Sequence, residues 1–330
     1  MYADPYVGKT AIIPVGKLEK IIKRIRSGIA DMHAFGVCVG LTNMLWPIIA
    51  HCPEGIREAI LKNKKRKIDD LLQKTCSETI QKYSLLQPQE RESEVRNDAP
   101  IFVCWLQGIE KAPCLVKACV RSIEQHASGH PVHVITLANY KEWVSLPRVV
   151  IQRQEEQMIA NAHFADVLRC ALLAKYGGCW IDATIWMSGD IHAEIFERPF
   201  YSCRFPAEGR FVTDNMWSNF FIAAKPDSVT INFTKDMFYE YVEKESRFID
   251  YFLMDYIIRW GYDNIPAIRK EIDQIPYNNQ QIGALRDMLY VPCNSPEVES
   301  VLKESYIHKL SWRLDLSQLP NDSVGKFILR

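Results

Sequence analysis

One stretch, FADVLRCALLAKYGGCWIDATIW at residues 164–186, restricts the fold more than any other part of the sequence. Its first half carries apolar residues at the spacing of one helix face, namely Phe164, Val167, Leu168, Ala171 and Leu172. Gly177 and Gly178 then supply the left-handed backbone that ends many helices, and the aromatic and β-branched run after them is typical of a buried strand. The sequence therefore predicts a helix that packs on a sheet and leads directly into one of its strands, as in an α/β protein.

Two charged residues of this predicted helix lie away from its apolar face. Asp166 and Arg169 are three residues apart and so are neighbours on the helix surface, with the acid in the first turn, where the helix dipole favours it. A surface ion pair that only stabilises the helix would have the same spacing. Along the following strand side chains alternate, so one face is expected to carry Trp180, Asp182, Thr184 and Trp186.

Asp182 and Thr184 are therefore expected to project together. Their Cα atoms, two residues apart on a strand, would be roughly 6 to 7 Å apart, so both oxygens could reach one divalent ion or one sugar diphosphate. The whole passage resembles the capsular polysaccharide synthesis family of glycosyltransferases, whose pattern is an aspartate and an arginine on a helix, then YGG, then a W-I-D-A-T strand. It is also similar to the wider group of DXD sugar-transfer enzymes, from which it departs at Thr184.

The resemblance extends over residues 99–313. Segments in the family's order are APIFVCWLQG before the motif, and SNFFIAAKPDS, YFLMDYIIRW, IPYNNQ and IHKLSWR after it. The resemblance implies a GT-A fold, a mixed α/β sheet with a nucleotide-binding half. It also implies transfer of a sugar from a nucleoside diphosphate donor, most often UDP, to a growing or lipid-linked glycan. The setting would be bacterial capsule or other surface polysaccharide synthesis, with retention of anomeric configuration.

The resemblance also assigns roles to individual residues. Asp182 is expected to hold the ion or the donor at the strand tip, while Asp166 and Arg169 grip the sugar of the donor. Trp105 is expected to stack on the uracil, with a core tryptophan as the alternative, and the nearby Gln107 is a further candidate for binding the donor. The remaining candidates for binding the donor or acceptor are Thr184, Asn219, Asn279, Lys309 and Arg313.

Each of these candidates has a simpler alternative. Lys309 could bind phosphate oxygens through its ammonium and Arg313 through two N–H groups of its guanidinium, or both could be solvated surface charges. Asn279 could bind sugar hydroxyls or only form a polar turn with its neighbours. Asn219 could touch the donor or the acceptor, or cap a local turn.

A divalent metal is the expected cofactor. Thr184 offers a neutral hydroxyl in place of the second carboxylate of a DXD pair, and such a hydroxyl is a weaker ligand for Mn²⁺ or Mg²⁺. Asp182 would then need help from the donor's diphosphate and from a neutral group such as His308, which could equally be a surface or core histidine.

Composition excludes some classes of function. Forty basic residues balance forty acidic ones, which argues against nucleic acid as a partner because such proteins usually carry a basic excess. Ten cysteines occur at irregular spacings, and those in apolar runs (Cys104, Cys119, Cys170 and Cys179) are interpreted as reduced core residues. The first fifteen residues lack the pattern of a signal peptide, so a cytoplasmic location is expected, where activated sugars are made.

The sequence is expected to divide into an N-terminal helical accessory segment, residues 1–90, and a catalytic domain, residues 91–330. A polar stretch at 87–100 reads as the linker. Between two basic helical patterns, residues 32–53 carry no Asp, Glu, Lys or Arg, which is long enough for a membrane span. Glycine, proline and polar residues inside this run favour packing against protein, with peripheral contact at the inner face of the cell membrane as the alternative.

Two rival functions have some support in the sequence. A hydrophobic strand followed by D-x-T is part of the signature of some phosphohydrolases, but the second aspartate that they require is replaced by Thr184. A non-catalytic protein that binds a nucleotide sugar, or that scaffolds polysaccharide assembly, would also explain the incomplete DXD pair.

Overall fold

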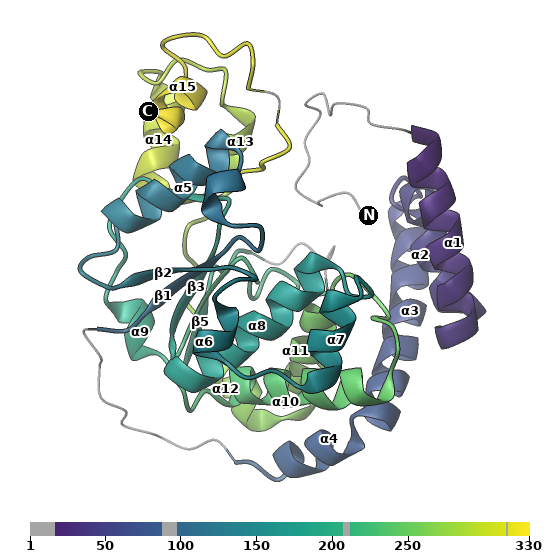
Figure 1. Ribbon diagram of the computed structural model, residues 1–330. Helices are drawn as coiled ribbons and strands as arrows, with labels where there is room; N and C mark the ends of the chain where they lie inside the picture. The colour runs from purple at the N-terminus through teal and green to yellow at the C-terminus, as the bar shows by residue number, and fades with distance from the viewer. Residues whose placement is uncertain (1–16, 88–97, 207–211, 315) are drawn as a thin grey trace.

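A five-stranded mixed sheet lies at the centre of the protein (Figure 1). The computed structural model describes residues 17–87, 98–206, 212–314 and 316–330. The strand order is β2-β1-β3-β6-β5, in which β1 is parallel to β2 and β3, and β6 is antiparallel to β3 and β5. The strands are β1 (Ile101–Cys104), β2 (Val132–Ile135), β3 (Gly178–Asp182), β5 (Phe200–Ser202) and β6 (Phe221–Ala224). The predicted mixed α/β class is confirmed.

Side chains that alternate along the strands pack into two hydrophobic cores, one on each face of the sheet. Phe102, Trp180 and Ile222 pack on one face against α8, α10 and α11. Val103, Ile181 and their neighbours pack on the other face against α5. The helices of this part are η1 (Ile109–Lys111), α5 (Cys114–Gln125), α6 (Tyr140–Trp143), α7 (Arg148–Glu155), α8 (Asn161–Tyr176), α9 (Glu194–Glu197), α10 (Val229–Lys244), α11 (Leu253–Asn264) and α12 (Pro266–Asp273).

The predicted helix and its glycine stop are confirmed in α8. All five residues of the apolar stripe are buried, and the helix ends at Tyr176. Gly177 and Gly178 follow with φ of 66° and 89°, and a Cβ on Gly178 would lie 2.0 Å from the carbonyl oxygen of Pro100. Only glycine fits there, because the chain must enter the sheet directly beside the start of β1. Asp166 lies beyond the first turn, contrary to expectation, because α8 already begins at Asn161.

The expected single strand through Trp186 is wrong. β3 ends at Asp182, and after a turn the chain forms β4 (Ile185–Met187), which pairs with β7 (Ile307–Lys309) in a separate two-stranded sheet. The neighbouring strand β1 also ends at this level, since Cys104 is the register partner of Asp182. Without a longer neighbour the chain leaves the sheet and finds its hydrogen-bond partners in the C-terminal part.

The C-terminal elements gather beside α5 (Figure 1). They comprise α13 (Ala284–Asp287), α14 (Pro296–Glu304), β7 and α15 (Val324–Leu329). Leu115 and Cys119 of α5 share a third hydrophobic cluster with Leu285, Val298 and Val324. This cluster holds β7 in place against the end of the central sheet.

Between residues 17 and 87, the described N-terminal part contains the helices α1 (Lys17–Phe35), α2 (Val37–Ile49), α3 (Glu54–Thr75) and α4 (Ser77–Ser84). The predicted helices are confirmed, whereas the predicted linker and the boundary at residue 90 lie mostly outside the described residues. Ile68, Leu72 and Tyr83 of α3 and α4 belong to the same core as α8 and α10. Among the described residues, no helix combines the length and apolarity needed to cross a bilayer.

Candidate active site at the end of β3

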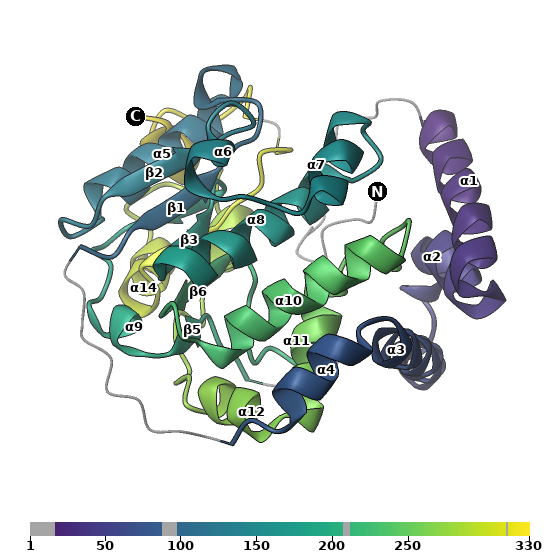
Figure 2. The ribbon, with the colours of Figure 1, turned by 60° about the horizontal axis from the view of Figure 1, so that its bottom comes forward.

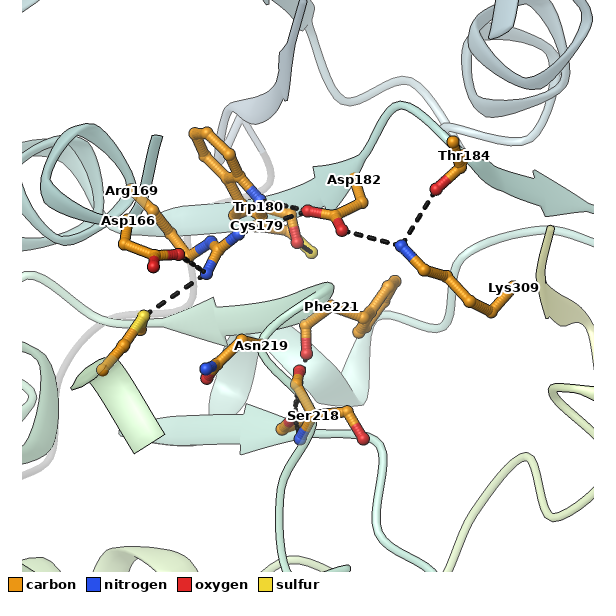
Figure 3. Close-up of polar contacts among 12 residues, drawn as sticks. Asp166, Arg169, Cys179, Trp180, Asp182, Thr184, Ser218, Asn219, Phe221 and Lys309 are labelled. Atoms are coloured by element: carbon orange, nitrogen blue, oxygen red, sulfur yellow. Dashed lines mark hydrogen bonds and ion pairs between the residues drawn. The ribbon is translucent and has the colours of Figure 1, made fainter. Parts of the chain in front are cut away.

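Asp182 lies between two cations at the carboxyl end of β3 (Figure 3). Its Oδ1 accepts hydrogen bonds from Nη2 of Arg169 at 3.2 Å and from Nε1 of Trp180 at 3.0 Å, and its Oδ2 accepts one from Nζ of Lys309 at 2.8 Å. Burial would raise the pKa of Asp182, but Lys309 and then Arg169 outweigh it and lower the pKa to about 2. Asp182 is therefore fully ionised at neutral pH.

Arg169 joins Asp182 to Asp166. Its Nη1 donates to Oδ1 of Asp166 at 2.8 Å, and its guanidinium lies 4.8 Å from the ring centre of Trp180. Arg169 is only 5% exposed, so the alternative of a surface ion pair does not describe this arrangement. Burial raises the pKa of Asp166 to about 6, although Arg169 opposes the shift. Nε of Arg169 is buried and has no hydrogen-bond partner among the described residues.

Lys309 reaches the site from β7 of the second sheet. Its ammonium donates to Asp182 and also to Oγ1 of Thr184 at 2.9 Å. Asp182 and Thr184 project together, as expected, but across a turn rather than along one strand, and the group that they share in the structure is the ammonium of Lys309. Figure 3 shows the four charged residues in a row from Asp166 to Lys309.

Asp255, on α11, is a site residue that the sequence analysis missed. Its Oδ1 accepts hydrogen bonds from Nε1 of Trp217 at 3.0 Å and from Nδ2 of Asn219 at 2.8 Å. The adjacent Met254 contacts Arg169 through its sulfur at 3.3 Å, so Asp255 lies beside the charged row. Burial, then the nearby Asp166, raises the pKa of Asp255 to about 7. The one feature of the sequence that could have indicated Asp255 is its position as the single acid in the apolar run YFLMDYIIRW.

The raised pKa of Asp255 makes stability depend on pH. The folded protein keeps this proton to higher pH than the unfolded chain, so the free energy of unfolding should fall between about pH 4 and pH 7. Asp255→Asn keeps the acceptor oxygen and removes the titration, and should gain on the order of 4 kcal/mol over the wild type at pH 8. Urea denaturation at pH 5 and pH 8 measures the difference. Asp70→Asn, on an exposed part of α3, is the control, and an unchanged pH slope in Asp255→Asn would contradict the assignment.

Trp105, Gln107 and Arg313 lie near the same edge of the sheet. Trp105 directly follows Cys104, the register partner of Asp182, and its Nε1 is buried without a described partner. Its ring meets the edge of Trp312 at a centroid distance of 6.3 Å, and the guanidinium of Arg313 lies 5.1 Å from the Trp312 ring. Gln107 is exposed beyond the strand end. No hydrogen bond or ion pair described in the structure joins these residues to the charged row.

Asn219 and Asn279 have different surroundings. Asn219 belongs to the site through Asp255, and its own Oδ1 is buried without a described partner. Asn279 is buried in a turn, where its Oδ1 accepts from the backbone N–H of Tyr306 at 3.1 Å and its Nδ2 donates to Asn278. Asn279 therefore links its turn to the segment before β7, and its contact with sugar hydroxyls stays a prediction.

His308 does not join Asp182. Adjacent strand residues point to opposite sides, and Lys309 is the one that faces the site. His308 is fully buried, packs against Trp186 and exchanges a 2.9 Å hydrogen bond with Ser188. Burial lowers its pKa to about 4, so it is neutral at pH 7. The expected pairing of His308 with Asp182 around an ion is therefore replaced by Lys309.

The donor set at Asp182 does not fit a resident divalent ion. Both carboxylate oxygens already accept hydrogen bonds from cations, and an ion beside them would be repelled by Arg169 and Lys309. Within the described parts of the chain, no group of three or more His, Cys, Asp or Glu side chains could hold a metal.

Fold and site together define an α/β protein whose charged site lies at the carboxyl end of a strand parallel to its neighbour, the usual place for ligands in such sheets. The chain belongs to the capsular polysaccharide synthesis protein family, whose model matches residues 50–328. This match confirms the resemblance seen in the sequence. It includes α3 and α4 and leaves out α1 and α2.

Comparison with solved structures returned a protein described as the apo structure of the bifunctional glycosyltransferase WbbM. It aligns over 88% of this chain and 67% of its own, with 12% sequence identity and a TM-score of 0.34. Among curated proteins none matches this chain.

Proposed function

We propose that this protein is a GT-A glycosyltransferase that moves a sugar from a UDP-sugar to a growing or lipid-linked glycan during capsular or other surface polysaccharide synthesis. The observation that supports it best is the ammonium of Lys309, held by Asp182 and Thr184 at the end of β3. Family membership supports the same function.

Lys309 is proposed to stabilise the diphosphate as it leaves. An ammonium has three donor hydrogens, and two of those on Lys309 are directed at Asp182 and Thr184, which leaves one for a phosphate oxygen. A fixed cation at this point stabilises the negative charge that grows as the bond between sugar and phosphate breaks. Asp182 acts as a positioning residue, because its hydrogen bonds hold the cationic groups of Lys309 and Arg169 in place before the donor binds.

Asp166 and Asn219 are proposed to bind the sugar of the donor. Asp166 has accepting oxygens beside Arg169, and Asn219 offers a buried Oδ1 that still lacks a partner. Buried polar atoms without partners are rare in proteins, so a ligand hydroxyl is a reasonable complement. Trp105, just past the end of β1, is proposed to stack on the uracil. Retention of configuration is part of the proposal and is read from the anomeric signals of the product by NMR.

Binding of UDP should not require a metal. The positive charge that a divalent ion would supply is already provided by Lys309 and Arg169, so UDP should bind with the same affinity in excess chelator and in Mn²⁺. Calorimetry with UDP alone, Mn²⁺ alone and both together measures this. A UDP affinity that rises at least tenfold with Mn²⁺ would show instead that an ion displaces Lys309 from Asp182, and would restore the metal expected from the sequence.

A screen of donor hydrolysis across nucleotide sugars tests the function as a whole. Release of UDP from one UDP-sugar, with stimulation by a glycan acceptor, is the expected result. Binding of UDP without turnover of any donor would favour the scaffold alternative that Thr184 suggests. Absence of both binding and turnover would reject the proposal.

A further inference from the structure

The helices α1 and α2 form a tightly packed hairpin. A Cβ on Gly28 would lie 2.6 Å from Cβ of Met44, and one on Gly40 would lie 2.3 Å from Cγ of Met32. These glycines let the two helix backbones approach closely, so the pair behaves as one unit. Figures 1 and 2 place the hairpin at the edge of the molecule, away from the sheet.

Polar residues fix one side of the hairpin to the rest of the protein. Asp31 of α1 is buried and accepts from Arg247 at 2.8 Å. Asn43 of α2 donates to the carbonyl oxygen of Ile249 at 3.0 Å and accepts from Lys64, which is paired with Asp250. The orientation of the hairpin is therefore set by buried hydrogen bonds and ion pairs.

The opposite side of the hairpin is apolar and exposed. At 100° per residue, its side chains lie on the faces of α1 and α2 that point away from Asp31 and Asn43. They are Ile22, Ile25 and Ile29 of α1 and Leu41, Leu45 and Ile48 of α2. Exposure reaches 47% at Ile29 and 66% at Ile48, and such a continuous patch on a protein surface usually marks an interaction site. We call these six residues the hairpin face.

Basic residues border the hairpin face on both sides. Lys23 and Arg26 are exposed on α1. On the other side, Asn63 of α3 donates to the sulfur of Cys38 at 3.1 Å, and the exposed Arg66 donates to Asn63 at 3.0 Å. The only acid between residues 21 and 53 is the buried Asp31, although the chain as a whole has forty acids and forty basic residues. The part of the border that α1 and α2 contribute is therefore cationic, whereas the exposed Glu54 and Glu58 lie at the start of α3.

We propose that the hairpin face docks on an anionic lipid surface, with α1 and α2 lying in the plane of the membrane. An apolar helix face flanked by Lys and Arg binds at the boundary between headgroups and acyl chains, because its apolar side chains contact the acyl chains and its cations contact the anionic headgroups. A second copy of the chain would bring the same cationic border against itself, which opposes dimerisation through this face. The proposal goes beyond sugar transfer and does not depend on it.

Vesicle flotation of the whole protein tests the docking. The protein should float with vesicles of equal parts phosphatidylcholine and phosphatidylglycerol, and float less at high salt because the lipid charge is screened. Leu41→Gln/Ile48→Gln should weaken binding by roughly tenfold or more, the effect of losing two buried aliphatic side chains. Lys23→Gln/Arg26→Gln should reduce the difference between anionic vesicles and vesicles of phosphatidylcholine alone.

The matched control is Leu85→Gln/Leu137→Gln, which removes two exposed leucines outside the hairpin and should leave flotation unchanged. Circular dichroism and thermal melting like those of the wild type show that all variants are folded, and this check does not use UDP, which separates the docking test from the test of the proposed function. Equal flotation of the control and Leu41→Gln/Ile48→Gln would overturn the proposal. So would a dimer in sedimentation that Leu41→Gln/Ile48→Gln dissociates, because the hairpin face would then bind a second copy.

Discussion

Replacing Lys309 by methionine is expected to reduce turnover of the donor about 100- to 1000-fold, the scale of losing one preorganised electrostatic group. Methionine has a similar length and packs well, so the fold should survive. The affinity for UDP should fall as well, since one of the two cations next to Asp182 is lost. The measurements are the rate of donor hydrolysis and the calorimetric dissociation constant of UDP.

Lys326→Met is the control for this experiment, because Lys326 is an exposed lysine on α15, at the same end of the chain. Lys309→Met also leaves Oδ2 of Asp182 and Oγ1 of Thr184 without their lysine partner, so added Mn²⁺ should recover part of the UDP affinity of this variant. Wild-type turnover in Lys309→Met would remove Lys309 from the mechanism.

Asp182→Asn is the second change with a large expected effect. It keeps an oxygen for Trp180 but leaves Arg169 and Lys309 without the carboxylate that holds them in place. The variant should lose about 3 kcal/mol of transition-state stabilisation, which lowers the turnover rate. Its affinity for UDP should stay unchanged, because the diphosphate itself neutralises Arg169 and Lys309. Rate and affinity are therefore expected to separate.

The control for Asp182→Asn is Asp190→Asn, in the loop after β4, where the carboxylate is largely exposed and contacts only His126 among the described residues. Circular dichroism establishes that both variants are folded. Full turnover in a folded Asp182→Asn protein would contradict a positioning role. Loss of UDP binding together with turnover would mean that Asp182 contacts the donor or an ion directly.

Local patterns in the sequence and the family resemblance together predicted the centre of the site. The period of α8 made Asp166 and Arg169 neighbours on the helix, and the glycine pair with the following strand placed Asp182 at a strand end. The family resemblance implied that all three share one site, and the structure joins them through Arg169. These features depend on neighbours within about twenty residues, where spacing decides which side chains share a face.

The errors concern contacts between distant parts of the chain. Alternation shows that His308 and Lys309 point to opposite sides, but which of them faces Asp182 depends on the pairing of β7 with β4. The break after Asp182 likewise depends on where β1 ends. Asp255 was missed because its role comes from Trp217 and Asn219 on another segment, and no local pattern reports such a contact.

The assembly of the site from two sheets makes its electrostatics depend on packing that lies outside it. Lys309 is carried by β7, which pairs with β4 and is packed by a cluster to which Val324 and Ile328 of α15 contribute. Loosening this cluster would move the ammonium away from Asp182, although α8 packs in a different core. The pKa of Asp182 is therefore controlled in part by apolar residues that do not touch it.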